Sequence, residues 1–170
     1  MLKVYNYIKE SLSGITDDHG KKVIKTIDFF NSQTSDPEGE NAFYLPAVFV
    51  EFQPVQWQSH TLGVQSANID FVLHIVTDSR KATLEKAAEF NLQLCNRIHA
   101  QLHGCLTGGG VNSFVRTGSF VSNDTTEFFE TLESYRVFVK DNSAVTVQQF
   151  IQTKPTDGAA GIDYEVIYLN

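Results

Sequence analysis

Two apolar segments, residues 45–52 and 68–77, constrain the fold of this chain more than any other feature, and a long polar stretch separates them. Every second residue of the later segment is large and apolar, so one of its faces carries only Ile69, Phe71, Leu73 and Ile75. Segments with this alternation predict the central antiparallel pair of a β-sheet. The polar stretch 53–68 is longer than most connections in compact domains, and loops of that length usually have a function or lack structure.

Two other segments have the spacing of amphipathic helices. Residues 2–13 place apolar side chains three to four positions apart and are followed by Gly14, a common residue at helix ends. Residues 81–103 predict the longest helix, with Asp78 or Ser79 as its N-cap. The buried stripe of this helix is expected to consist of Leu84, Ala87, Ala88, Asn91, Leu94, Cys95, Ile98 and Leu102.

Alternating segments at 22–30, 113–121 and 132–140 predict three more strands. The acidic stretch 31–41 is rich in turn-forming residues and is expected to be a surface excursion. The predicted order of elements is therefore α-β-β-β-α-β-β. This order predicts the α+β class, with a mainly antiparallel sheet of about five strands and two helices packed on one face.

The last part of the chain differs from the rest. We expect residues 1–141 to form the α+β domain and residues 142–170 to form a C-terminal extension. In this extension a flexible connector precedes an apolar run at 162–169. Such a run is expected to dock as a strand, either in its own sheet or on the edge strand of a neighbouring subunit.

Charge and composition narrow the classes of partner. The chain has 13 Lys and Arg against 20 Asp and Glu, and its formal net charge of -7 repels phosphate backbones and anionic membrane surfaces. We therefore expect no sequence-specific nucleic-acid partner and no membrane partner. With two cysteines and an N-terminal segment unlike an apolar signal sequence, the chain is expected in a reducing cytosol with free thiols.

Catalytic and metal-binding chemistry has weak support in the sequence. Cys95, His99 and His103 stand on adjacent turns of the long predicted helix, with Cys105 just beyond, and these four residues could hold zinc. The spacing favours the alternative, a buried thiol beside exposed histidines, because ligands from one helix rarely complete a tetrahedron. His74 is expected to be a partly buried, hydrogen-bonded histidine rather than a base. The sequence therefore predicts no enzyme, no catalytic residue, no metal and no cofactor.

A protein-protein interface is better supported. Trp57, the only tryptophan, stands among uncharged amide side chains, which is typical of interfaces. The alternative is that Trp57 folds back over the edge of its own core. The acidic bend near 128 and the C-terminal run add further apolar candidates. The candidate contact residues are Gln56, Trp57, Gln58, His60, Phe128, Phe129, Ile162, Tyr164 and Val166.

Four stretches of the first 140 or so residues carry a family resemblance: YNYIKESLSGI, YLPAVFVEF, GVQSANIDFVLHIVT and LEKAAEFNLQLCNRIHAQL. In these stretches and in its order of elements, the chain resembles the tail terminator proteins of long-tailed bacteriophages, also called tail completion or minor tail protein U-like proteins. Head-tail joining (neck) proteins share much of this pattern.

The resemblance implies a small structural subunit of a phage or prophage tail that assembles into a ring, commonly a hexamer. Such a ring caps the tail tube, ends its growth and offers a surface for head-tail joining, so the implied partners are further copies of the chain, the tail tube protein and a head-tail connector protein. The implied locations are the bacterial host cytoplasm during assembly and the virion tail. The alternative that the pattern leaves open is a neck protein of similar fold.

Overall fold

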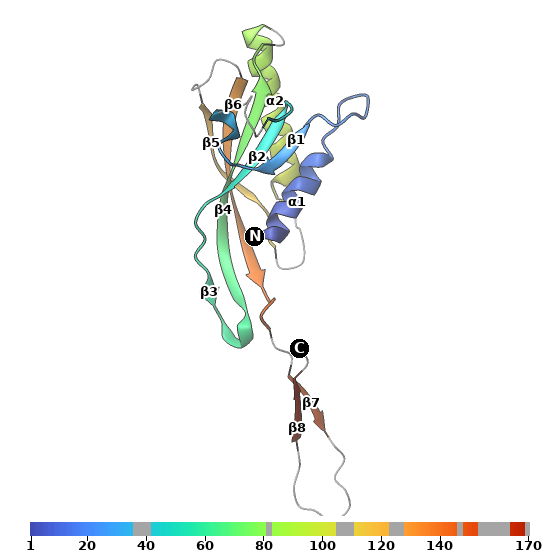
Figure 1. The fold of residues 1–170 in the computed structure, drawn as a ribbon, viewed down its shortest axis with the longest axis vertical. Coiled ribbons are helices and arrows are strands. Elements are labelled where there is room, and N and C mark those ends of the chain that lie inside the picture. Colours follow the sequence, from blue (N-terminus) through green and yellow to red (C-terminus); the bar gives the residue numbers. More distant parts are fainter. Residues whose placement is uncertain are drawn as a thin grey trace, which may run out of the picture.

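A computed structural model describes residues 1–35, 42–80, 83–104, 111–122, 128–145, 148–152 and 164–168 of the chain (Figure 1). Its helices are α1 (Leu2–Ser13) and α2 (Leu84–Leu102), with short 3₁₀ turns at Gln33–Ser35 and Thr61–Gly63. Its strands are β1 (Thr26–Phe29), β2 (Ala47–Phe52), β3 (Gln58–Ser59), β4 (Gln65–Asp78), β5 (Val115–Ser122), β6 (Phe128–Asp141), β7 (Gln148–Gln152) and β8 (Tyr164–Tyr168).

Six of these strands form one open sheet in the order β1-β2-β4-β6-β5, and β3 pairs with one end of β4. β1 is parallel to β2, and the other ladders of this sheet are antiparallel. The longest ladder joins β4 to β6 from Gln65 opposite Asp141 to Asp78 opposite Phe128. The predicted α+β class and the central antiparallel pair, β2 with β4, are confirmed.

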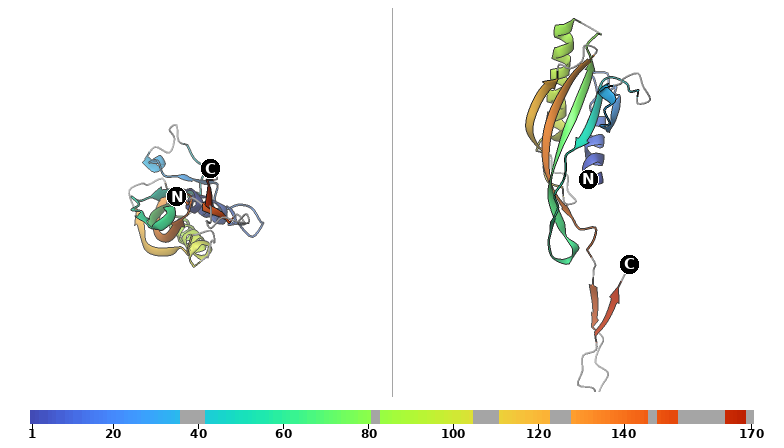
Figure 2. Two further views of the ribbon diagram at one scale, coloured as in Figure 1. Left: turned by 90° about the horizontal axis from the view of Figure 1, so that it is seen from below. Right: turned by 60° about the vertical axis from the view of Figure 1, so that its left-hand side comes forward.

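Both helices pack on one face of the sheet, as predicted (Figures 1 and 2). Helix α1 contributes Val4, Tyr5, Ile8 and Leu12 to the core, and α2 contributes Leu94, Cys95, Ile98 and Leu102. These side chains meet the apolar face of β4 that the alternation predicted, because Ile69, Phe71, Leu73 and Ile75 are all at most 1% exposed. Burial of each large apolar side chain stabilises the fold by about 1.5–3 kcal/mol, so this layer is the main source of stability.

The opposite face of the sheet carries a second, smaller apolar cluster. Ala47, Phe49, Val76 and Phe128 are buried there, and Phe30, Phe43 and Leu45 pack against them. Neither of the two described helices contributes to this cluster. We call this surface the outer face.

Three details of the predicted elements were wrong. The N-cap of α2 is Thr83 rather than Asp78 or Ser79, because β4 continues to Asp78 and the chain turns before the helix begins. Leu84 is 70% exposed rather than buried, because it lies on the first turn of α2, at the end of the domain (Figure 1). β1 has four residues, fewer than the predicted strand 22–30, because Val23 and Lys22 are held against the turn that follows α1.

The C-terminal strands form a separate antiparallel ribbon, from Gln148 opposite Tyr168 to Gln152 opposite Tyr164. Figure 1 shows this ribbon beyond the end of β6, below the β3-β4 hairpin, whereas the helices lie above that hairpin. The division into a domain 1–141 and an extension 142–170 stays a prediction.

Candidate partner interface

The polar stretch 53–68 forms a two-stranded projection. Gln58 pairs with Ser66 and Ser59 with Gln65, so the ladder of β4 begins three residues earlier than the predicted strand. The turn between the strands is tight: the His60 backbone N–H donates to the carbonyl of Val64 at 2.7 Å. Most of this long loop was therefore missed as structure, because Gln and Ser are weak strand formers and a ribbon open to solvent on both faces has no apolar alternation.

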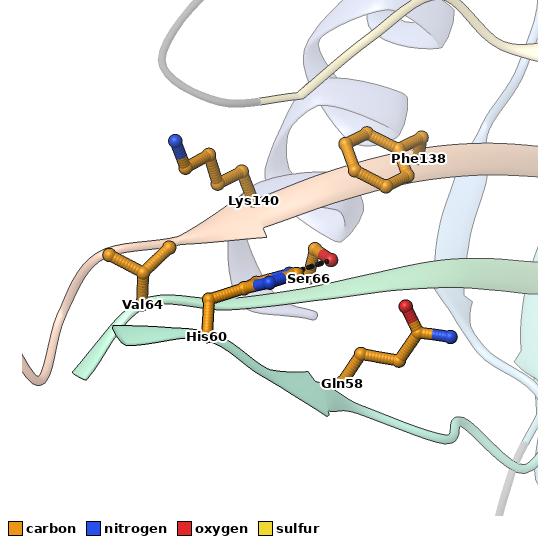
Figure 3. Close-up of a pocket in the computed structure, with 6 residues that line it drawn as sticks. All are labelled: Gln58, His60, Val64, Ser66, Phe138 and Lys140. Atoms are coloured by element: carbon orange, nitrogen blue, oxygen red, sulfur yellow. Dashed lines mark hydrogen bonds between the residues drawn. The ribbon is translucent and has the colours of Figure 1, made fainter. Parts of the chain in front are cut away.

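An open hollow of about 520 Å³ lies on the outer face where this hairpin meets the end of β6 (Figure 3). Its lining combines an amide, a hydroxyl, an imidazole, an ammonium group and one aromatic ring. The lining residues are Gln58, His60, Val64, Ser66, Phe138 and Lys140. This mixture can receive an apolar side chain against Phe138 and a carboxylate near Lys140, which is the chemistry of a protein contact.

One hydrogen bond and the register of β6 determine the shape of the hollow. The His60 Nε2 atom lies 2.7 Å from the Ser66 hydroxyl oxygen, across the hairpin. Phe138 is 40% exposed, and it lies on the outer face opposite Asn68 in the β4-β6 ladder. Two residues further along this ladder, Lys140 stands opposite Ser66. The sequence predicted Gln58 and His60 as contact candidates, but it did not predict that they lie beside β6. The β4-β6 register, which places them there, joins residues about seventy positions apart.

Trp57 folds back on its own domain, which was the alternative to an interface position. Its side chain is half-buried and packs against the main core, next to Val55, whereas Gln56, Gln58 and His60 are exposed. Trp57 therefore anchors the base of the hairpin to the domain. Any contact that it makes with a partner uses only the exposed part of the ring, and its role in an interface stays a prediction.

The other predicted contact residues are not among those that line this hollow. Phe128 is 5% exposed and belongs to the second apolar cluster, and Phe129 is half-buried opposite Thr77. Tyr164 and Val166 lie in β8, opposite Gln152 and Phe150, and Ile162 lies outside the described residues. Among the described candidates, the structure thus brings only Gln58 and His60 together at the hollow, and the contacts of all candidates with partners stay predictions.

A charged cluster on the outer face was not foreseen. His74 is 5% exposed, its Nδ1 lies 2.8 Å from a carboxylate oxygen of Glu130, and its Nε2 lies 3.0 Å from one of Glu51. The ring also stacks on Phe30, with centroids 3.8 Å apart. Burial lowers the pKa of His74, but the hydrogen bonds to Glu130 and Glu51 outweigh it, and the pKa is raised above its usual value.

This arrangement is a cross-link rather than a catalytic base. An imidazolium donates from both nitrogens, so protonated His74 joins a carboxylate of β2 to one of β6 across β4. The predicted hydrogen-bonded state of His74 is confirmed. Its partners were missed because Glu51 and Glu130 stand 23 and 56 positions away in the chain.

The cysteine and histidine set on α2 does not converge among the described residues. Cys95 is 3% exposed, and burial raises the pKa of its thiol to about 11, so it is an inert core side chain. The rings of His99 and His103 lie with centroids 4.6 Å apart, while Cys105 lies outside the described residues. Within the described part of the chain, no group of three or more His, Cys, Asp or Glu side chains could hold a metal ion.

A buried carboxylate under the same helix has a structural role. Glu133 is 3% exposed and accepts from the Arg116 guanidinium at 3.2 Å and from the Ser119 hydroxyl at 2.9 Å. These bonds compensate the cost of burying the charge, and they tie β5 to β6.

The fold and this surface define a class: an α+β domain whose sheet is covered by helices on one face, with a partly apolar outer face and a projecting hairpin. In the described residues, neither helix is long and apolar enough to span a membrane.

No family model matches the chain, and no curated protein matches it in sequence. Among solved structures, the chain is similar to one described as "Virion of native gene transfer agent (GTA) particle". The TM-score is 0.50 at 15% sequence identity, and the similarity covers 81% of this chain and 95% of that chain. At this identity the similarity shows a shared fold.

Proposed function

We propose that this chain is a non-enzymatic structural protein of a phage or prophage tail, which forms a ring that caps the tail tube. The observation that carries the proposal is the fold shared with a chain of a gene transfer agent virion, of which 95% is covered. The family resemblance of the first 140 or so residues also supports it, and the stretches of sequence that carry this resemblance form α1, β2, β4 and α2.

The surface of the domain suits assembly. The outer face exposes Val115, Phe120 and Phe138 by 48%, 65% and 40%, and partly exposed apolar surface of this kind is common at subunit contacts. Subunits that pack through two different surfaces close into a ring when the rotation between them allows it. The ring end that carries the hairpin would face the tail tube or the head-tail connector, through the hollow beside Lys140.

The charge of the chain is consistent with this role. DNA must pass through a tail ring without being held, and a formal net charge of -7 disfavours contacts with phosphate. A host-cytoplasmic protein that later becomes part of the virion tail also has no need of a disulfide, and Cys95 is a buried free thiol.

The second candidate is a head-tail joining (neck) protein. The observation that favours it is the same shared fold, because the description of the similar structure covers a whole particle and gives no role for its chain. The two candidates differ in partner: a tail terminator binds the end of a tail tube, whereas a neck protein binds the head's connector.

Electron microscopy of the purified protein with and without tail tubes tests the proposal. We expect rings or ring fragments in the protein alone at high concentration, and tubes of defined length with a ring at one end in the mixture. Light scattering at high concentration should show a multimer. Binding to isolated head connectors but not to tubes would favour the neck protein, and a monomer that binds neither would contradict both.

A matched pair of variants tests the hollow. Lys140→Glu replaces the ammonium group that lines the hollow by a carboxylate, whereas Lys21→Glu makes the same change at an exposed turn near α1. We expect Lys140→Glu to reduce capping of tubes while Lys21→Glu leaves it unchanged, with the same thermal unfolding for both. Equal capping by the two variants would show that the hollow does not face the tube.

A further inference from the structure

Among the described strands, the C-terminal ribbon has no third strand beside it. β7 and β8 pair with each other and form no ladder with the main sheet. An isolated two-stranded ribbon is at best marginally stable in water, and a third strand or a packed layer is needed to hold it. The sequences of the two strands, QQFIQ and YEVIY, are rich in β-branched and aromatic residues, which favour a place in a larger sheet.

The main sheet has a matching open edge. β5 lies at the end of the strand order and is paired with β6 alone among the described strands. Phe120 and Val121 are 65% and 42% exposed and point to opposite faces of the strand, so the described structure covers this edge on neither face. An edge strand with exposed apolar side chains is a template for another strand unless a partner occupies it.

The ribbon is held away from the β5 edge of its own chain. A Cβ atom at Gly63 would lie 2.2 Å from the Ala144 carbonyl oxygen, so the hairpin tip is in close contact with the start of the extension. β7 begins three residues after Val145, which places Gln148 within about 11 Å of that point.

The edge of β6 between the ribbon and β5 is itself occupied. The near end of β5, Val115, stands opposite Arg136, about 17 Å of strand before β6 ends at Asp141. Val111 bridges to Val139 in this interval. Figure 1 shows the ribbon beyond the end of β6, so to reach its own β5 edge it would have to fold back along β6. On that path it would meet the bridge of Val111 to Val139.

We propose that the β7-β8 ribbon of one copy adds to the β5 edge of a second copy, with β8 as the strand that pairs. β8 is favoured over β7 because β7 is tied closely to the hairpin of its own chain. This inference rests on the proposed function because it takes the assembly to be a ring. In that ring each subunit adds its ribbon to the next subunit and receives the ribbon of the one before. Such head-to-tail strand addition links unlike surfaces, as closure into a ring requires.

Cross-linking of a mixture of two chains, each with one introduced cysteine, tests this pairing directly. One chain carries Val121→Cys on β5, and the other carries Glu165→Cys on β8. Both chains carry Cys105→Ala. Both keep Cys95, because this thiol is buried, has a pKa of about 11 and therefore reacts slowly. With a short bismaleimide, we expect a cross-linked dimer in the mixture and little in either chain alone.

Three results would overturn the inference. The first is the absence of a cross-linked dimer in the mixture. The second is a cross-link within a single chain that carries both Val121→Cys and Glu165→Cys, which would mean that the ribbon docks on its own sheet. The third is efficient cross-linking of the β8 cysteine to Asp28→Cys on β1 but not to β5, which would place the ribbon on the opposite edge.

A charge on the edge provides the second test. Phe120→Lys puts an ammonium group on the exposed edge strand, whereas Leu84→Lys makes the same type of change at a residue of α2 that is 70% exposed. We expect Phe120→Lys to weaken self-association by about tenfold or more, measured by sedimentation, and Leu84→Lys to leave it unchanged. Equal self-association of the two variants would contradict the assignment of β5.

The same samples separate this inference from the proposed function. Capping of tail tubes without the β5-β8 cross-link would leave the proposed function standing and refute the ribbon pairing. The cross-link without any binding to tubes or connectors would support the ribbon pairing and refute the proposed function.

Discussion

Asn91 is the polar residue on which the attachment of α2 to the sheet most depends. Its side chain is 2% exposed, its amide nitrogen donates to the Thr77 hydroxyl at 3.0 Å, and its amide oxygen accepts from the Thr131 hydroxyl at 2.6 Å. Thr77 lies on β4 and Thr131 on β6, and they are 0% and 2% exposed. One amide therefore satisfies a buried hydroxyl on β4 and another on β6.

Substitution Asn91→Ala leaves both hydroxyls without this partner. A buried polar group that loses its hydrogen bond costs about 1–3 kcal/mol, so two of them, with a small cavity, should lower the free energy of unfolding by about 3 kcal/mol. For a domain of this size the melting temperature should fall by about 6–12 °C. Urea unfolding followed by far-UV circular dichroism measures the free energy, and calorimetry measures the melting temperature.

Two further variants make the test specific. Asn96→Ala, at an exposed position of the same helix, should change the free energy of unfolding by no more than about 0.5 kcal/mol. The triple variant Asn91→Ala, Thr77→Val, Thr131→Val removes the stranded hydroxyls and should regain about 1–2 kcal/mol relative to Asn91→Ala alone. The reasoning fails if Asn91→Ala costs no more than Asn96→Ala, or if the two valines destabilise the protein further.

Three other predictions concern the outer face, the hairpin and the core. The pKa of His74 is raised in the folded state, so the stability that its protonated form contributes is full below the usual pKa of 6.5 and is lost as the pH rises through the folded-state pKa. His74→Gln should remove this loss from a plot of unfolding free energy against pH. An unchanged plot would refute the assignment. Gly63→Ala should destabilise the protein by more than the cost of about 1 kcal/mol for a positive φ, because the new Cβ would lie 2.2 Å from the Ala144 carbonyl oxygen. Gly20→Ala, which has a similar φ of +74 and open space around it, is the control, and equal losses in chemical denaturation would contradict the contact. With its thiol pKa raised to about 11, Cys95 should resist maleimide at pH 8 in the folded protein and react after denaturation, as mass spectrometry of the labelled peptides can show.

The sequence predicted the elements whose periodicity the core enforces. The alternation of Ile69, Phe71, Leu73 and Ile75 identified β4 because one face of that strand is wholly buried. The buried stripe of α2, including Asn91, was found in the same way, apart from Leu84, which is exposed, and Ala88, which is half-buried.

Contacts between distant segments could not be predicted. The hollow needs Lys140 opposite Ser66, and that register follows from the whole β4-β6 ladder rather than from either strand. The parallel pairing of β1 with β2 was not foreseen either, since a short strand such as Thr26–Phe29 has little alternation from which to infer its neighbour. The hairpin was missed because polar ribbons lack a buried face, which is the property that pattern analysis detects.

The distribution of buried groups separates stability from assembly in this domain. The helix-covered face holds both the large apolar core and the satisfied polar groups Asn91 and Glu133, so most of the folding free energy and the uniqueness of packing arise on that side. The outer face, the hairpin and the β5 edge contribute less to the core, and their exposed residues can change with small effects on folding. Phe120 illustrates the consequence: at 65% exposure it adds little to the stability of a single chain, yet it lies on an edge strand that pairs with β6 alone among the described strands. An exposed apolar residue on an edge strand lowers the solubility of a monomer, and it stabilises an assembly only when a second strand covers it. Phe120→Lys should therefore weaken assembly without changing the fold.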